Sequence, residues 1–81
     1  MPTAFVLIST QTGFPIADVL KDLKKVEGVD EAFAVYGVSD IIARVRAESM
    51  DKLKEIVTLR IRMVDNVRRT LTMIVVESQD R

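Results

Sequence analysis

The residues best suited to holding a small molecule are Tyr36-Gly37-Val38-Ser39-Asp40, which separate two runs of strand-forming residues. Gly37 permits a tight turn whose amides can point at an anion, and Asp40 can accept hydrogen bonds from an ammonium group. An amino acid carries a carboxylate and an ammonium group on one carbon, which matches this pair of charges. The competing interpretation is that Gly37 makes a turn and Asp40 caps its own backbone. On residue types alone, the structural interpretation is favoured.

A second candidate is the pair Thr70 and Thr72, whose hydroxyl groups lie on one face of an expected strand. Threonine is common in strands, so the pair has an ordinary structural explanation. The alternative is that this face meets a neighbouring subunit and lines a small polar pocket there.

Other kinds of chemistry find little support. The 81 residues contain no cysteine and no histidine, which excludes a disulfide framework, a thiolate nucleophile, a zinc finger and an imidazole base. There is no glycine-rich phosphate loop and no metal-ligand spacing, so we expect no cofactor, no metal and no catalytic residue. Twelve basic and twelve acidic residues give zero net charge, and a nucleic-acid-binding surface usually needs a basic surplus.

The turn must be positioned by short strands and amphipathic helices. We expect one helix between Pro15 and Gly28, and a second from the N-cap Ser49 to the break at Asp65. We expect strands over residues 3–9, 31–36, 41–47 and 67–77. The order β-α-β-β-α-β and right-handed crossovers predict a ferredoxin-like α+β fold in one domain, residues 1–81. Its antiparallel four-stranded sheet would carry both helices on one face.

The first strand is apolar on both faces, because Phe5 and Leu7 alternate with Ala4, Val6 and Ile8. A sheet covered by helices on one side only should be polar on the other. We therefore expect the bare face to be covered by a second copy, giving a dimer through the sheets. The alternative is that a few exposed aliphatic side chains are ordinary.

The sequence predicts a cytoplasmic protein. Its longest apolar runs, such as residues 4–8, are too short to cross a bilayer, and the N-terminus lacks the pattern of a secretory signal. We expect no contact with a membrane.

The whole chain resembles the effector-binding and oligomerisation (RAM) domain of the Lrp/AsnC, or feast/famine, transcription regulators. The matching phrases are TAFVLIST, LKKVEGVDEAFAVYGVSDIIARVRA, LKEIVTLRIRMVDNV and RRTLTMIVVE. The pattern of that family is a Gly-Val pair after the first helix, a Gly-x-x-Asp turn before aliphatic residues, and a Thr-x-Thr in the last strand. Here these are Gly28-Val29, Gly37 to Asp40, and Thr70 to Thr72.

The resemblance implies dimers that assemble into rings, such as octamers or decamers, with amino-acid effectors bound between dimers against the Gly-x-x-Asp turn. Tyr36 departs from the small hydroxyl residue often found before this glycine. No helix-turn-helix domain precedes the first strand, so we expect a stand-alone domain that binds no DNA itself. Mixed assembly with full-length Lrp/AsnC regulators is a further expectation. The alternatives are a small dimeric enzyme of this fold, an ACT-like regulatory domain and a structural oligomer without ligand.

Overall fold

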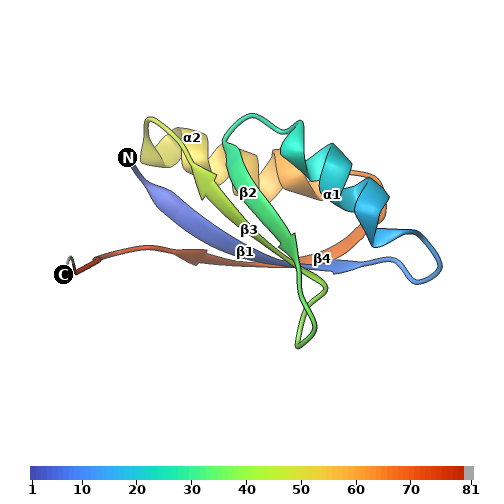
Figure 1. Cartoon of the computed structure of the whole chain (residues 1–81). Coiled ribbons are helices and arrows are strands. Elements are labelled where there is room, and N and C mark those ends of the chain that lie inside the picture. Colours follow the sequence, from blue (N-terminus) through green and yellow to red (C-terminus); the bar gives the residue numbers. More distant parts are fainter. Residues whose placement is uncertain (80–81) are drawn as a thin grey trace.

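The computed structural model describes residues 1–79 and confirms the ferredoxin-like α+β architecture. A four-stranded antiparallel sheet has the order β2-β3-β1-β4, and both helices cover one of its faces (Figure 1). The elements are β1 (Thr3–Thr10), α1 (Ile16–Lys24), β2 (Val29–Ala34), β3 (Ile41–Arg46), α2 (Met50–Glu55) with its continuations η1 (Ile56–Arg60) and η2 (Ile61–Met63), and β4 (Val67–Ile74).

The element boundaries follow local chemistry. The side chain of Ser49 accepts a hydrogen bond from the Lys52 amide at 3.1 Å, which confirms the expected N-cap. Gly28 and Asn66 have positive φ angles of 98° and 68°, so the chain turns sharply before β2 and β4. β2 begins two residues earlier than expected, and β4 ends at Ile74 instead of residue 77.

The second helix contains one widened turn. Residues 56–60 are π-helical, and the Ile61 amide donates to the Ile56 carbonyl, five residues back. The Thr58 hydroxyl donates to the Lys54 carbonyl at 2.6 Å in the same region. In a wider turn, each residue rotates the chain by a smaller angle about the helix axis. Ile56 and Ile61 therefore both face the sheet, and they are 2% and 0% exposed.

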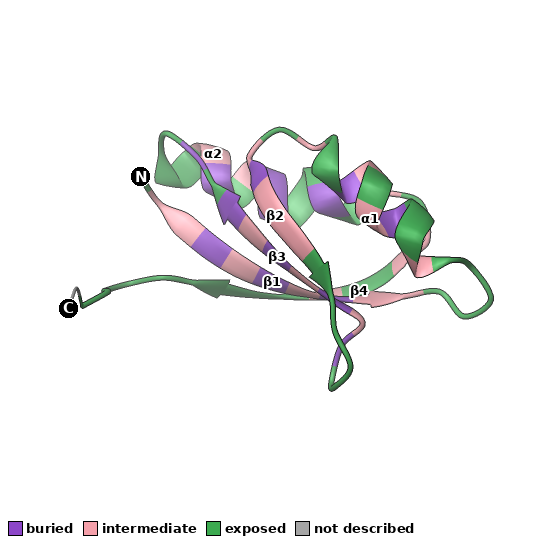
Figure 2. Cartoon of the chain, in the orientation of Figure 1, coloured by how far each residue is buried: buried purple, intermediate pink, exposed green. Residues whose placement is uncertain are grey.

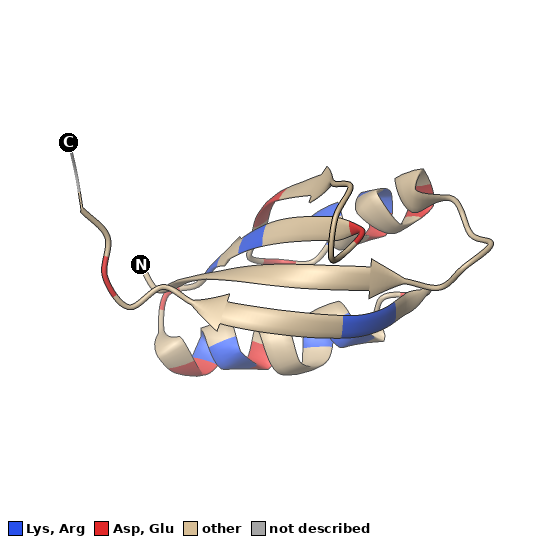
Figure 3. Cartoon of the chain, turned by 90° about the horizontal axis from the view of Figure 1, so that it is seen from below, with Lys and Arg blue, Asp and Glu red and all other residues tan. Residues whose placement is uncertain are grey.

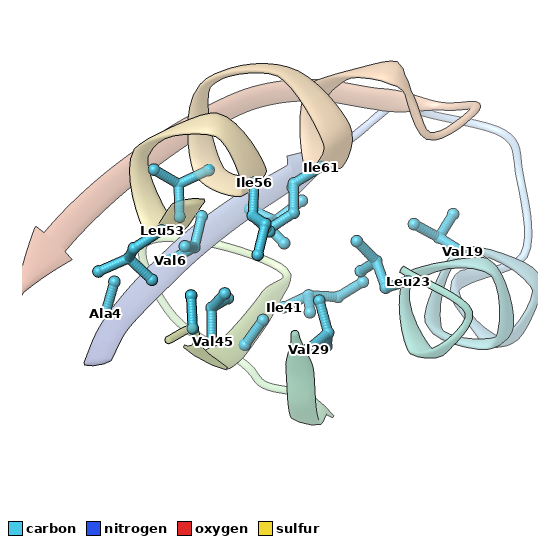
Figure 4. Close-up of a cluster of buried hydrophobic side chains, with 14 residues drawn as sticks. Ala4, Val6, Val19, Leu23, Val29, Ile41, Val45, Leu53, Ile56 and Ile61 are labelled. Atoms are coloured by element: carbon cyan, nitrogen blue, oxygen red, sulfur yellow. The ribbon is translucent and has the colours of Figure 1, made fainter. Parts of the chain in front are cut away.

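The core lies between the helices and the covered face of the sheet. Ala4, Val6 and Ile8 of β1 point into it, and in Figure 2 this strand alternates between buried and half-buried residues. Figure 4 shows the core side chains gathered between the strands and both helices. The core comprises Ala4, Val6, Ile8, Val19, Leu23, Val29, Ile41, Ala43, Val45, Ala47, Leu53, Ile56, Val57 and Ile61.

The other face of the sheet is bare and largely apolar. We call this the bare face and define its apolar centre by residues Phe5, Leu7, Ile42, Leu71 and Met73. Leu71 and Met73 of β4 are 61% and 50% exposed. Seen from this side, β1 carries no charge along its length, and blue marks the start of β4 (Figure 3). The apolar face expected from the sequence is therefore present, and its occupant stays a prediction. Among the described residues, no helix is long and apolar enough to span a membrane.

Candidate functional site

The segment 35–40 joins β2 to β3 and projects from the sheet on the side opposite the helices (Figure 1). At its base the Val35 amide donates to the Asp40 carbonyl at 2.9 Å, and the Asp40 amide donates to the Ile8 carbonyl at 3.0 Å. The side chains of Tyr36 and Val38 are almost fully exposed. The base of the hairpin is thus fixed to the sheet, and its tip is open to solvent.

Asp40 fastens this hairpin to the end of β1. Its Oδ2 atom accepts hydrogen bonds from the Thr10 backbone amide at 2.8 Å and from the Thr10 hydroxyl at 3.2 Å. The carboxylate therefore contacts a residue 30 positions away, instead of capping its own turn. We call the two hydrogen bonds the Asp40–Thr10 latch. This contact shows that Asp40 has a structural role, whatever else it binds.

Gly37 does not use the conformational freedom expected of it. Its φ angle is not positive, in contrast to those of Gly13 and Gly28. A Cβ atom built at Gly37 would meet no atom within 4 Å. Within residues 1–79, the amides of residues 37–39 have no hydrogen-bond acceptor. Free amides and open space at the tip are what the approach of a ligand or of another chain requires.

A hollow of about 110 Å³ lies beneath the hairpin on the bare face. The register of the sheet creates it, because Ser9 pairs with Arg69 and Leu7 pairs with Leu71, and paired residues share a face. The hairpin supplies the remaining wall. The hollow is lined by Leu7, Ser9, Val38, Ser39, Arg69 and Leu71.

The lining combines a cation, two hydroxyl groups and an aliphatic floor. The Ser39 hydroxyl donates to the Ile41 carbonyl at 3.3 Å, and Ser39 is the only polar residue of the described chain that is buried. Such a set suits a small ligand with an anionic end and an apolar part. It holds no acid and base pair that would transfer protons in a reaction.

Thr70 and Thr72 lie on the other side of the sheet. They pair with Ile8 and Val6, both of which are fully buried under the helices. Within one chain the two threonines therefore do not share the hollow with the hairpin. Thr70 is half-buried and Thr72 is exposed, since β4 is the edge strand.

The structure thus brings two of the predicted site residues, Val38 and Ser39, to the hollow. Four further lining residues were not predicted: Leu7, Ser9, Arg69 and Leu71. The alternation of side chains places Leu7 on one face of β1 and Leu71 on one face of β4. Only the pairing register of the two strands shows that these are the same face of the sheet.

A larger hollow, of about 240 Å³, lies near Gly28 and the N-terminus. Its lining contains four charged residues, Glu27, Arg46, Glu48 and Lys52, of which Arg46 and Lys52 already pair with Asp30 and Glu55, respectively. Among the described residues, no group of three acids, histidines or cysteines could hold a metal ion. Because the predicted turn residues Val38 and Ser39 line it, the hollow beneath the hairpin is the better candidate site.

Comparison with known proteins agrees with this architecture. The family model of the Lrp/AsnC ligand-binding domain matches residues 3–80. An HTH-type transcriptional regulator of Pyrococcus furiosus is 35% identical over 74 residues, which are 89% of this chain and 49% of that protein. The chain thus spans about half the length of the curated relatives it matches.

Two solved structures extend the comparison. A protein of Thermus thermophilus is 31% identical with a TM-score of 0.89, and each chain covers 100% of the other. The feast or famine regulatory protein of Mycobacterium tuberculosis, solved in complex with L-methionine, is 28% identical with a TM-score of 0.80. That alignment covers 100% of this chain and 54% of the other. The match over nearly the whole chain shows that this protein belongs to the Lrp/AsnC ligand-binding domain family.

Proposed function

We propose that this domain senses a free amino acid, or a metabolite of similar size, at the hollow and the hairpin above it. The proposal rests on one observation: a hairpin with unpaired amides is latched over a polar-edged hollow on the uncovered face of the sheet. The M. tuberculosis relative, whose structure contains L-methionine, supports an amino acid as the ligand. The response would be regulatory, with no reaction catalysed.

The same domain assembles through its bare face. Exposed apolar surface costs about 25 cal/mol per Å², and Leu71 and Met73 are at least half exposed in the single chain. A second copy would bury them sheet against sheet, and the hollow, whose lining includes Leu71, would then be enclosed at the margin of that contact. Further association of such dimers into rings, of octamer or decamer size, is the arrangement that the family resemblance implies.

The remaining predicted ligand residues have a place in this assembly. Tyr36 and Gly37 stand at the hairpin tip, away from the hollow, while Thr70 and Thr72 face the helix side of the edge strand. We propose that these four residues reach an effector only across a contact with another copy. Asp40 contributes by holding the hairpin in place through its latch, and its second oxygen remains available to an ammonium group.

The cellular role follows from the relatives. Regulators about twice as long as this chain contain a matching domain, so mixed assembly through the bare face would alter such a regulator without any contact between this domain and DNA. Native mass spectrometry of this protein mixed with a candidate full-length regulator tests this role. Mixed species are expected, and their absence would count against it.

The ligand is tested by a thermal-shift screen against the common amino acids. A ligand at one hundred times its Kd should stabilise each site by roughly 2.7 kcal/mol, which is a rise of several degrees in Tm. Val38→Asp, which places a negative charge at the wall of the hollow, should abolish the response. If no amino acid raises Tm, the proposal that the ligand is an amino acid is wrong.

The assembly is tested by light scattering of Leu71→Asp and Met73→Asp. Both variants should be smaller than the wild type at the same concentration, because each places a charge in the contact. Leu59→Asp is the matched control, since Leu59 is 49% exposed on the helical side of the molecule. A monomeric wild type, or equal loss of assembly in the control, would refute assembly through the bare face.

A further inference from the structure

We propose that the outer edge of β4 is a second self-association surface, at which β4 of another copy pairs antiparallel and continues the sheet. The edge consists of the backbone groups of residues 70–76 that point away from β1. Strands pair in the plane of a sheet, whereas a face contact lies above that plane, so covering the bare face does not block the edge. This contact is distinct from the one through the bare face.

β4 has backbone groups without a partner. It is the last strand of the order β2-β3-β1-β4, and among the described strands it pairs with β1 alone. The Val75 amide donates to the Thr3 carbonyl at 2.9 Å, so the backbone groups of Val75 point toward β1. This direction alternates along an antiparallel strand. The N–H and C=O groups of Thr70, Thr72 and Ile74 therefore point outward, where the described chain provides no strand to receive them.

The opposite edge of the sheet is protected against pairing. β2 is short, contains the acids Asp30 and Glu31, and has a register shift between Val29 and Glu31. Short length, charge and irregular pairing are devices that keep an edge strand from joining other chains. Residues 70–76 contain no charged residue, proline or glycine, and the pairing of residues 70–74 with β1 shows no shift. The β4 edge thus lacks these devices.

The segment after β4 lengthens this edge. Residues 75–79 continue beyond the sheet as an arm (Figure 1). The first two residues of the arm are valines, and Val76 is 95% exposed. A β-branched residue at this place suits a strand that continues along the β4 edge of another copy.

The charges that flank the edge are complementary. The uncharged residues 70–76 have Arg69 on one side and Glu77 on the other. Neither side chain forms an ion pair within residues 1–79. An antiparallel partner with the same sequence presents these two charges in reverse order. A second copy therefore matches the edge at both ends.

Two-fold pairing centred on Met73 brings these charges together. Each Arg69 then lies opposite Glu77 of the other copy. Arg68 is equally unpaired within residues 1–79, but it cannot take this role in a regular ladder. The backbone groups of Arg68 point outward, those of Glu77 belong to the inward set, and only residues of the same set lie opposite each other. The charges thus select one register.

Charge reversal tests this register, and light scattering measures the mass. The variants are made in the Leu7→Asp background, which places a charge in the bare-face contact outside β4. Leu7→Asp alone should be a dimer paired through the edge. Adding Arg69→Glu or Glu77→Arg should raise the Kd of that dimer roughly tenfold or more, because like charges then lie opposite each other. Arg68→Glu is the control and should leave the Kd unchanged.

Two rescues distinguish a pairing defect from a folding defect. A chain with both reversals, and an equimolar mixture of the two singly reversed chains, should form the dimer again because opposite charges face each other. Failure of both rescues would overturn the register and with it the proposal.

Amide hydrogen exchange tests the edge in the wild type, without any variant. In the proposed register Thr72 and Ile74 of the two copies exchange backbone hydrogen bonds. Their amides should then be protected as strongly as those of Leu71 and Met73, which point toward β1. Fast exchange at Thr72 and Ile74 in the assembled protein would overturn pairing through the edge, whatever else occupies it.

The two contacts fail separately. If Leu7→Asp is monomeric while the wild type assembles, the edge proposal is wrong and assembly through the bare face stands. If Leu7→Asp keeps the full mass of the wild type and Arg69→Glu dissociates it, the edge is the contact and assembly through the bare face is wrong. Neither result bears on the ligand, which the thermal-shift screen tests.

Discussion

Removal of the Asp40 carboxylate tests whether the hairpin is held by folding contacts or by a ligand. In Asp40→Ala, the Thr10 amide and hydroxyl lose their acceptor, at 2.8 and 3.2 Å. A hydrogen bond to a charged group contributes about 1.5–3 kcal/mol, and water can reach the longer one in this half-buried place. We therefore expect a loss of about 2 kcal/mol, close to the value of the shorter bond alone.

For a chain of 81 residues this loss is large. Each kcal/mol moves Tm by about 4–8 °C in a domain of this size, so Asp40→Ala should lower Tm by roughly 8–16 °C without ligand. Asp40→Asn keeps an acceptor in the same place and should lose about half as much. Asp65→Ala is the control, since Asp65 is exposed and has no side-chain partner within residues 1–79.

Calorimetry of all four proteins at equal concentration measures these shifts, because the Tm of an oligomer depends on concentration. A cycle with Thr10→Val isolates the hydroxyl contribution. A Tm for Asp40→Ala within one or two degrees of the control would refute the latch. That result would mean that the carboxylate is reserved for a ligand and contributes little to folding.

Two glycine positions give opposite expectations. Gly28→Ala should lower the free energy of unfolding in urea by roughly 1–3 kcal/mol, because φ is 98° and the new Cβ would lie 2.6 Å from Ile56 Cδ1. Gly13→Ala is the control and should lower it less, since φ is 94° but no atom lies within 4 Å of the new Cβ. Equal losses of unfolding free energy in the two variants would show that the clash is absent. Gly37→Ala should leave the unfolding free energy of the unliganded protein within about 0.5 kcal/mol but weaken the ligand response or the assembly, and a large loss of stability would contradict the open tip.

Much of the fold was predictable because several of its boundaries have a local chemical signal. Ser49 caps its helix, Gly28 and Asn66 take positive φ, and the hairpin falls where the strand-forming runs are interrupted. The end of β4 was misplaced because apolar residues continue to Val76, although the last paired residue is Ile74. Apolar character alone does not show where a strand loses its partner.

The site was less predictable because it depends on pairing between distant strands. Both alternating sets of β1 are apolar, so the sequence could not show that Val6 faces the core and Leu7 the bare face. The partner of Asp40 is 30 residues away, and no turn pattern indicates it. Arg69 looked like half of a short basic pair, and only its register with Ser9 places it in the hollow.

The widened turn at residues 56–60 has a consequence for changes in chain length. The Ile61-to-Ile56 hydrogen bond spans one residue more than an α-helical bond, so the helix contains the equivalent of a one-residue insertion. Deletion of the exposed Leu59 would let the helix close into a regular α-helix and would keep Ile61 on the buried side. Elsewhere in this helix, a deletion would rotate every later residue by about 100° and turn core residues toward solvent. The second helix should therefore tolerate the loss of one residue at this turn, because the turn already contains one residue more than an α-helix needs.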